Sequence, residues 1–554
     1  MQRLLAICLA FCLPLGAQDV APGNGTIVAD ELRADLFFLA SDEMQGRLTE
    51  TPENEITSAF IRSRFERLGL EPMGPGGSFY QSFRLMKAEL ANPLENDLDL
   101  IRDDGTTMRA QLSDSFFPLR FSASGSVEAE VVFAGYGIRA PKLSHNDYDD
   151  DYGDGSLRGK IVLVLDHEPG ERDPESIFHG VVTSEYSRDL RKALYAQNAG
   201  AAGILFVSDV HNHPDESNFS SLAARTWLDP PRRVPRYTLA LWAERVHIPA
   251  MQISPALANA IVSTTGRTLV ELAQASETEG GVEPVPVPSR RVRITASVER
   301  NVVDNRNVVA AIEGSDPVLK DEWVILCAHF DHEGADGNRV FNGADDDGSG
   351  TVALLEIAEA YALAARTGER PRRSVMFAAW NSEERGLLGA WAYAENPPVS
   401  LAQTVAVLNM DMIGRNEEVR VGGGRRFRGL ELQTAESNAN ALNIMGYTYS
   451  ADLKAAVEQA NRGYELELEM DYDNNPSNLL RRSDQWPFLQ MGVPSLFFHT
   501  GLHPDYHTEF DVPERIEYQK LERIARLVHQ LSWNLANSST RPSFDRLKDA
   551  AAVQ

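Results

Sequence analysis

Cysteine is scarce in this sequence of 554 residues, which contains only three. Two of them fall within the first 17 residues, where a positively charged start and the apolar run Leu4–Leu15 precede the small residues Gly16 and Ala17. This order is typical of a secretory signal peptide, because the apolar run is shorter than the roughly 20 residues of a membrane span. We therefore predict that residues 1–17 direct export to the periplasm or the medium. Cys327 is then the one cysteine left, which excludes an intramolecular disulfide.

Basic residues are also in the minority, since 53 Lys and Arg face 80 Asp and Glu and the formal charge is -27. Nucleic acids and anionic membrane surfaces both require a basic protein surface, so this charge argues against either partner. Beyond the first residues, the chain has no apolar run long enough to cross a bilayer. Hydrophobic residues at 43% and charged residues at 24% are typical of a globular protein. We expect a globular chain without an integral membrane span, and its oligomeric state stays open.

The composition changes along the chain and predicts how it is divided. Between residues 125 and 265, short β-branched runs bounded by glycine indicate a β-rich inserted domain. Residues 266–289 are rich in Glu, Gly and Pro, which is typical of a linker. Over 290–537, apolar runs alternate with helical patterns, which predicts an α/β fold with a mainly parallel central sheet covered by helices. We assign residues 18–124 to the N-terminal part of this α/β domain and residues 538–554 to a polar C-terminal tail.

Acidic residues and histidines follow the apolar runs of the predicted sheet. They come directly after the runs over 323–328, 374–380, 405–410 and 494–498. The residues at these ends include His329, Asp331, Glu383, Glu384 and Asp411, and an Asp345-Asp346-Asp347 run precedes the helix expected over 350–366. The carboxyl ends of parallel strands meet at one edge of a sheet, where such folds bind ligands. Buried carboxylates without a cation cost on the order of several kcal/mol each, so we predict a metal centre at this edge.

The residue types in this cluster favour a catalytic metal site. Imidazole and carboxylate ligands without a thiolate pair suit Zn²⁺, Co²⁺ or Mn²⁺. His329 and Asp331 are two residues apart on an extended segment, which places Asp331 to accept the second ring N–H of His329. The adjacent Glu383 and Glu384 allow one carboxylate to bind metal while the other moves a proton, as a metal-activated water requires.

Five blocks of the sequence, in this order, resemble the metal-binding blocks of the M28 peptidases, the co-catalytic zinc aminopeptidases: AHFDH, NGADDDGSG, NSEERGLLG, NMDMIG and HPDYHT. The segment LASDEMQGR near residue 40 resembles the N-terminal block of that family. Residues 125–265 resemble the protease-associated (PA) domain that many members carry as an insertion. The resemblance covers most of the chain after residue 17. It implies a zinc-exopeptidase-like fold with an inserted β-rich PA domain.

The resemblance also implies two bound Zn²⁺ ions, with Co²⁺ or Mn²⁺ as alternatives. The five ligand positions it assigns in this sequence are His329, Asp345, Glu384, Asp411 and His507. His329 and Asp411 would share one ion and Glu384 and His507 the other, while Asp345 would bridge both.

Further roles follow from the same resemblance. Glu383 is the expected general base, Asp331 the carboxylate behind His329, and Tyr506 a phenol near the tetrahedral intermediate. The remaining histidines of these blocks are left out of the ligand set, with roles in the pocket wall at most: His332, His499 and His503.

The implied activity is hydrolysis of the N-terminal bond of peptide or protein substrates. Carboxypeptidase-like, dipeptidase or glutaminyl cyclase activity are alternatives on the same fold. A carboxypeptidase needs arginines that clamp a terminal carboxylate, and several are available: Arg415, Arg481, Arg482 and the pair Arg425-Arg426. A binding protein without catalysis is a further alternative, but it predicts broken ligand positions, and all five are intact here.

Two histidines outside the α/β domain, His211 and His213, stand in an HNHP segment. Because a lone histidine is more often structural than a ligand, we interpret this segment as a surface loop.

Overall fold

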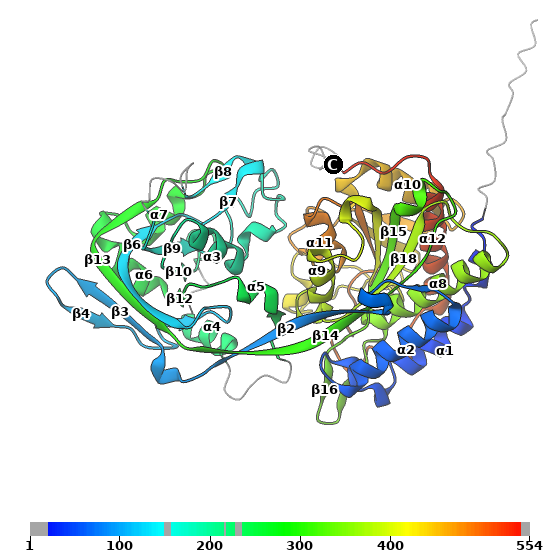
Figure 1. Cartoon of the computed structure of the whole chain (residues 1–554), viewed down its shortest axis with the longest axis horizontal. Helices are drawn as coiled ribbons and strands as arrows, with labels where there is room; N and C mark the ends of the chain where they lie inside the picture. Colours follow the sequence, from blue (N-terminus) through cyan, green and yellow to red (C-terminus); the bar gives the residue numbers. More distant parts are fainter. Residues whose placement is uncertain (1–19, 149–156, 215–217, 228–234, 545–554) are drawn as a thin grey trace, which may run out of the picture.

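The structure is a computed structural model that describes residues 20–148, 157–214, 218–227 and 235–544. The predicted signal peptide and residues 545–554 of the predicted tail therefore lie outside the described residues. The chain forms two lobes, each built around one large sheet (Figure 1). Two long antiparallel strands, β2 (Tyr80–Leu90) and β14 (Val298–Ile312), run between the lobes.

The ten-stranded lobe contains the strands expected from the apolar runs. The sheet order is β11 (Thr238–Leu239), β2, β14, β18 (Ser374–Trp380), β15 (Trp323–His329), β19 (Thr404–Met410), β22 (Ser495–His499), β20 (Ala441–Met445) and β21 (Glu467–Glu469), with β1 (Glu71–Pro72) paired to β14. The strands β18, β15, β19 and β22 are parallel, and all their residues apart from Trp323 are buried. This confirms the predicted α/β fold with a mainly parallel central sheet, which antiparallel strands extend on both sides.

Helices cover both faces of this sheet. One face packs against α1 (Ala29–Leu39), α2 (Pro52–Leu68), α8 (Gly350–Arg366) and α12 (Tyr518–Asn537), with α10 (Ala451–Asn461) beside α12. The other face, which is nearer to the second lobe, packs against α9 (Leu388–Glu395) and α11 (Gln485–Gln490). Successive residues of β15 alternate between the two faces, so that Leu326 packs with the first group and Cys327 with the second. Because both faces are covered, the strands carry no polar alternation.

The helix α2 shows how local sequence sets an element boundary. The side chain of Thr51 accepts a hydrogen bond from the N–H of Asn54, and Pro52 occupies the first turn, where it loses no helical hydrogen bond. Gly69 ends the helix in the left-handed conformation that glycine adopts without strain. Within the described ranges, no helix of either lobe is long and apolar enough to span a membrane.

The eight-stranded lobe contains the second sheet. Its order is β4 (Thr107–Arg109), β3 (Asp97–Arg102), β13 (Val285–Ala296), β6 (Gly125–Phe133), β9 (Ile161–Leu165), β10 (Gly203–Val207), β12 (Ala250–Ile253) and β5 (Phe116–Pro118). The strands β6, β9, β10 and β12 are parallel. The helices between β9 and β13 are α3 (Asp189–Asn198), α4 (Phe219–Thr226), α5 (Ala240–Glu244), α6 (Pro255–Val262) and α7 (Leu269–Ala275).

Two of the expected segment boundaries differ from the structure. Residues 97–118, expected in the α/β domain, form β3, β4 and β5 of the eight-stranded sheet. The linker expected over 266–289 instead contains α7, which a capping box between Thr268 and Glu271 begins, and the start of β13. The low content of apolar residues misled the prediction, because the part of β13 in this stretch buries only Val287 and α7 buries only Leu269, Leu272 and Ala273.

Candidate metal centre

The carboxyl ends of the central parallel strands bring two groups of histidines and acids together. The first group contains His329, Glu383 and Asp411, and the second contains His332, Asp346, Glu384 and His507. In each group, one nitrogen or oxygen atom per residue lies within 4.8 Å of the others. His329 ends β15, the two glutamates follow β18, and Asp411 follows β19, so the topology explains why residues far apart in sequence meet here.

Asp346 connects the two groups. One carboxylate oxygen, Oδ1, lies 3.3 Å from His329 Nε2, and the other, Oδ2, lies 2.9 Å from His507 Nε2. The residue is 3% exposed, and it stands in the turn directly before α8. A carboxylate that faces both groups in this way has the position required to bridge two ions.

The structure places Asp345, the expected bridging residue, outside both groups. Its Oδ1 accepts a hydrogen bond from the N–H of Gly414 at 2.7 Å, and its Oδ2 lies 3.3 Å from His503 Nε2. Asp347 also points elsewhere and accepts hydrogen bonds from the backbone N–H groups of His329 and Gly350. The expectation for Asp345 is therefore wrong in position, because three consecutive aspartates project in different directions and only the backbone of this turn decides which one faces the centre.

His332 joins the second group although the sequence interpretation left it out. Its Nδ1 lies 2.7 Å from Glu384 Oε1 and 3.7 Å from Asp346 Oδ2, and its side chain is fully buried. The available signal was its position one residue after Asp331 in the same strand-end segment. His499 remains outside the groups, with its Nδ1 2.9 Å from the carbonyl oxygen of Asp411.

Asp331 lies behind His329, but its backbone makes the closer contact. The carbonyl oxygen of Asp331 is 3.1 Å from His329 Nδ1, whereas its carboxylate Oδ1 is 3.8 Å away. The same Oδ1 accepts a hydrogen bond from the backbone N–H of Glu383 at 2.9 Å. Asp331 thus fixes the ring of His329 through its carbonyl group and the backbone of Glu383 through its carboxylate.

The donor atoms of the two groups fit metal ions. Several buried atoms lie close to one another but make no well-oriented hydrogen bond to another described residue: His329 Nε2, both ring nitrogens of His332, Glu384 Oε1, Asp411 Oδ1 and His507 Nε2. Buried polar atoms normally have partners, so their convergence indicates that a cation completes the site. The set consists of imidazole nitrogens and carboxylate oxygens, which suits zinc. Cys327 does not contribute, because its Sγ contacts Asn409 Oδ1 at 3.3 Å.

The two adjacent glutamates have different electrostatic environments. Burial raises the pKa of Glu383 well above its usual value, and the negative charges of Glu384 and Asp411 act in the same direction. Burial also acts to raise the pKa of Glu384, but the positive charge of the neighbouring His507 holds that pKa below the usual range. Glu384 is therefore the more readily ionised carboxylate, which fits a ligand, and Glu383 holds a proton more readily, which fits an acid and base.

A cavity of about 320 Å³ opens onto this centre. Its acidic lining residues are Asp346, Glu383, Glu384 and Asp411, and its basic lining residues are Arg188, Arg481 and Arg482, together with His499, His507 and Tyr506. Arg188 comes from the eight-stranded lobe, so both lobes contribute to the cavity wall.

Glu185 of the eight-stranded lobe organises one side of the cavity. Its carboxylate lies 2.6 Å from Arg188 Nε and accepts a hydrogen bond from Trp486 Nε1 of α11 at 2.8 Å. Tyr506 also lines the cavity. Its hydroxyl is 3.4 Å from Arg482 Nη2, and burial raises its pKa to about 12. Its phenol therefore stays protonated at neutral pH and can donate a hydrogen bond into the cavity.

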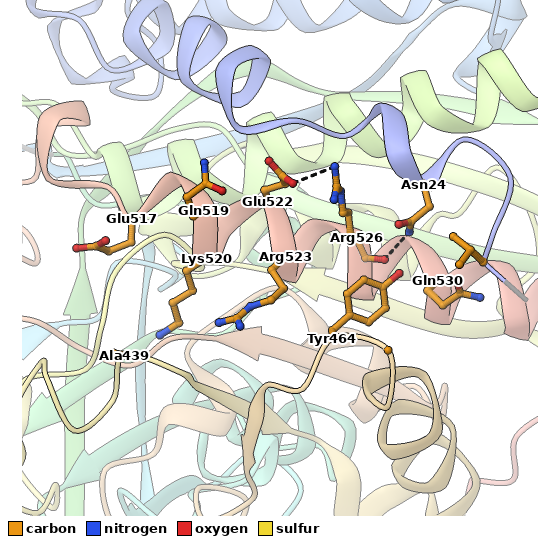
Figure 2. Close-up of a pocket in the computed structure, with 12 residues that line it drawn as sticks. Asn24, Ala439, Tyr464, Glu517, Gln519, Lys520, Glu522, Arg523, Arg526 and Gln530 are labelled. Atoms are coloured by element: carbon orange, nitrogen blue, oxygen red, sulfur yellow. Dashed lines mark hydrogen bonds and ion pairs between the residues drawn. The ribbon is translucent and has the colours of Figure 1, made fainter. Parts of the chain in front are cut away.

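Another cavity, of about 690 Å³, lies along α12 and carries no such chemistry (Figure 2). None of the predicted site residues lines it. Lys520 already contacts Asn416 Oδ1 at 2.7 Å, and Arg526 pairs with Glu522 at 2.9 Å. The smaller cavity at the strand ends is thus the candidate site.

Comparisons with known proteins identify a family match over the part of the chain that contains the two ligand groups. Residues 307–532 match the family model of peptidase family M28, and residues 127–261 match that of the PA domain. The protein named Probable glutamate carboxypeptidase AMP1, from Arabidopsis thaliana, is 27% identical over 481 residues, which are 82% of this chain and 60% of that protein. Aminopeptidase NAALADL1 from Mus musculus is 33% identical over 270 residues, 45% of this chain and 34% of that protein.

The chain spans about 60% of the length of the first of these relatives and a smaller share of the second. Among solved structures, an aminopeptidase from Aneurinibacillus sp. strain AM-1 superposes with a TM-score of 0.47 at 17% identity, covering 95% of this chain and 96% of that one.

Proposed function

Because the chain belongs to peptidase family M28 and carries a PA domain, we propose that it is an exopeptidase with two zinc ions, which hydrolyses a terminal peptide bond. The observation that carries this proposal is the carboxylate of Asp346, whose two oxygens face different ligand groups. His329 and Asp411 would hold one ion, and Glu384 and His507 the other, with His332 beside Glu384. Co²⁺ or Mn²⁺ would suit the same donor atoms.

The residues of the cavity divide the work of hydrolysis. When bound, two such ions acidify a water molecule and polarise the scissile carbonyl group. Glu383 would accept the proton of the attacking water and return it to the leaving amine. The N–H of Glu383 is held by Asp331, which keeps this carboxyl group at the cavity wall. The hydroxyl of Tyr506 would stabilise the oxyanion by donating a hydrogen bond.

Two substrate termini are candidates for recognition at this site, the N-terminus and the C-terminus. The sequence favours an aminopeptidase that acts on peptide or protein N-termini, as one of the relatives is named. The cavity favours the carboxypeptidase-like alternative, because all four of its acidic lining residues belong to the ligand groups and none is left to hold a free ammonium group. Its three arginines instead provide positive charge for a carboxylate.

A panel of peptide substrates, assayed with and without a chelator, tests both the metal-dependent peptidase activity and the choice of substrate terminus. The panel contains peptides with a free or acetylated N-terminus and with a free or amidated C-terminus. Cleavage that the chelator abolishes and that Zn²⁺ restores is expected, and its absence on every peptide would overturn the peptidase assignment. Cleavage that requires the free C-terminus supports the carboxypeptidase-like alternative, whereas cleavage that requires the free N-terminus supports the aminopeptidase.

Arg188→Gln sharpens the choice between the two ends. If Arg188 binds the terminal carboxylate, loss of this charge lowers kcat/KM about tenfold on peptides with a free C-terminus, by about 1.4 kcal/mol, and changes it little on amidated peptides. The matched control is Arg428→Gln, since Arg428 is exposed and does not line the cavity. An equal loss on both kinds of peptide would remove the support for carboxylate recognition.

A further inference from the structure

A third group of metal-ligand side chains lies in the eight-stranded lobe, outside the centre described above. His167 follows β9 and His213 follows β10, and these two strands are parallel neighbours. Both histidines therefore lie at the same edge of the sheet, and Glu171 joins them there. His213 lies in a loop, as the sequence predicts, but it is not a lone histidine, because Glu171 of a different loop contacts it.

The geometry of this group resembles a ligand set. His167 Nδ1 lies 3.0 Å from Glu171 Oε2, and His213 Nε2 contacts the other oxygen of the same carboxylate. One ligand atom from each residue lies within 4.8 Å of the others, and the two imidazole rings stack with centroids 4.1 Å apart. Zinc binds nitrogen and oxygen at about 2.0–2.1 Å, which requires donor atoms roughly 3–3.5 Å apart in a tetrahedral site. The separation of His167 and Glu171 is of this size.

The two loops that carry these residues are fixed to one another. Asp166 Oδ1 accepts a hydrogen bond from the backbone N–H of Asp209 at 2.6 Å, which ties the loop after β9 to the loop after β10. The ammonium group of Lys192 donates a hydrogen bond to the carbonyl oxygen of His167 at 2.5 Å. His167 itself has a φ of 61°, a conformation that these contacts hold in place. The donor atoms are thus positioned before any ion binds, which lowers the cost of binding.

We propose that His167, Glu171 and His213 form a third metal site, which binds a divalent transition-metal ion of the zinc type. Two imidazoles and one carboxylate are a set that zinc uses while a water molecule takes the fourth position. Ca²⁺ and Mg²⁺ prefer oxygen ligands throughout, so they fit this group poorly. The side chains of His167, Glu171 and His213 are 31%, 9% and 19% exposed, so the site is open enough to exchange its ion with solvent. A bound ion would cross-link the loops after β9 and β10.

Equilibrium dialysis of the full chain against Zn²⁺, followed by a metal count, tests the site. The wild type is expected to bind one ion more per chain than His213→Gln. His211→Gln is the matched control, because His211 is exposed, lies two residues away and is absent from the group. An equal count for the wild type and His213→Gln would overturn the proposal and leave a histidine–carboxylate ion pair. A failure at the catalytic centre lowers the count of all three proteins equally, so the two failures are distinguishable.

A second measurement needs no variant and therefore does not depend on the folding of His213→Gln. Diethyl pyrocarbonate modifies accessible neutral imidazoles, and mass spectrometry reads the modification of each histidine separately. At Zn²⁺ about ten times Kd, the free fraction falls to about one tenth, so modification of His167 and His213 should slow about tenfold. The rate at His211 should stay unchanged. Zinc-independent modification of His167 and His213 would contradict the proposal.

Discussion

The two lobes bring histidines and acids together through the same strand topology, but they differ in how far they bury them. In both sheets, histidines and acids follow neighbouring parallel strands and meet at one edge. In the ten-stranded lobe most of the ligand residues are buried, with His329 0% and Asp346 3% exposed, although the side chain of His507 is 28% exposed. In the eight-stranded lobe, His167 and His213 keep 31% and 19% of their side chains exposed. Strand topology therefore brings such residues together, and burial decides how strongly they depend on a cation.

The two groups also differ in the number of carboxylates that they bring together. A buried carboxylate without a compensating cation costs on the order of several kcal/mol, and like charges nearby add to that cost. The centre of the ten-stranded lobe holds four carboxylates around two ligand groups, and the group of the eight-stranded lobe holds one. We therefore expect metal at the first centre to be bound tightly and metal at the second group to exchange.

The largest expected effect is a loss of kcat that distinguishes Glu383, the proposed catalytic base, from Glu171 of the eight-stranded lobe. Glu383→Gln should lower kcat by several orders of magnitude while the bound metal is kept, because the amide is close in size and cannot accept the proton. Glu171→Gln, which makes the same chemical change in the other lobe, should leave kcat near the wild-type value. Steady-state kinetics with a metal count on both variants checks this. Near-normal turnover of Glu383→Gln would remove it as the base, and an equal loss in Glu171→Gln would abolish the distinction between the lobes.

A second comparison concerns two adjacent aspartates within the ten-stranded lobe. Asp346→Asn should lose most of its zinc and its activity, since this carboxylate faces both ligand groups. Asp345→Asn is expected to keep its zinc and to lose stability by about 1–3 kcal/mol, because a neutral amide weakens the buried hydrogen bond from Gly414 and replaces the oxygen that faces His503 Nε2.

Atomic emission analysis and thermal unfolding of both variants measure the two effects. The reverse pattern, with zinc lost from Asp345→Asn and kept in Asp346→Asn, would restore the bridging role that the sequence suggested for Asp345.

These aspartates also mark how far the sequence could predict the site. His329, Glu384 and Asp411 were found because buried strands have continuous apolar runs, and a run shows where its strand ends. The choice among Asp345, Asp346 and Asp347 depends on the backbone of one turn, on which hydrophobicity carries no information. The group of His167, Glu171 and His213 was missed for another reason: its members are ordinary residues until strand pairing brings their loops together.

The smallest expected effect is a contrast in pH dependence between buried groups of the two lobes. His529 of α12 is fully buried, and burial lowers its pKa to about 3. The unfolded chain has a histidine pKa of about 6.5, so unfolding takes up a proton between these values and the free energy of unfolding falls as pH falls. Glu168 of the eight-stranded lobe is also fully buried, and burial raises its pKa to about 7 although hydrogen bonds from Ser184 oppose this. Unfolding then releases a proton above about pH 4.5, and the free energy of unfolding falls as pH rises.

Two variants isolate these opposite slopes. Relative to the wild type, His529→Gln should gain stability as pH falls from 6.5 toward 5, and Glu168→Gln should gain stability as pH rises from 4.5 toward 7, each by at most about 1.4 kcal/mol per pH unit. Denaturant unfolding of the three proteins across this range measures both slopes. Parallel curves for His529→Gln and the wild type would mean that the imidazole is protonated in the folded lobe. Because each substitution removes one titrating group and keeps an uncharged hydrogen-bonding side chain, slopes of the same sign would show that the two lobes do not differ in how burial controls their ionisation.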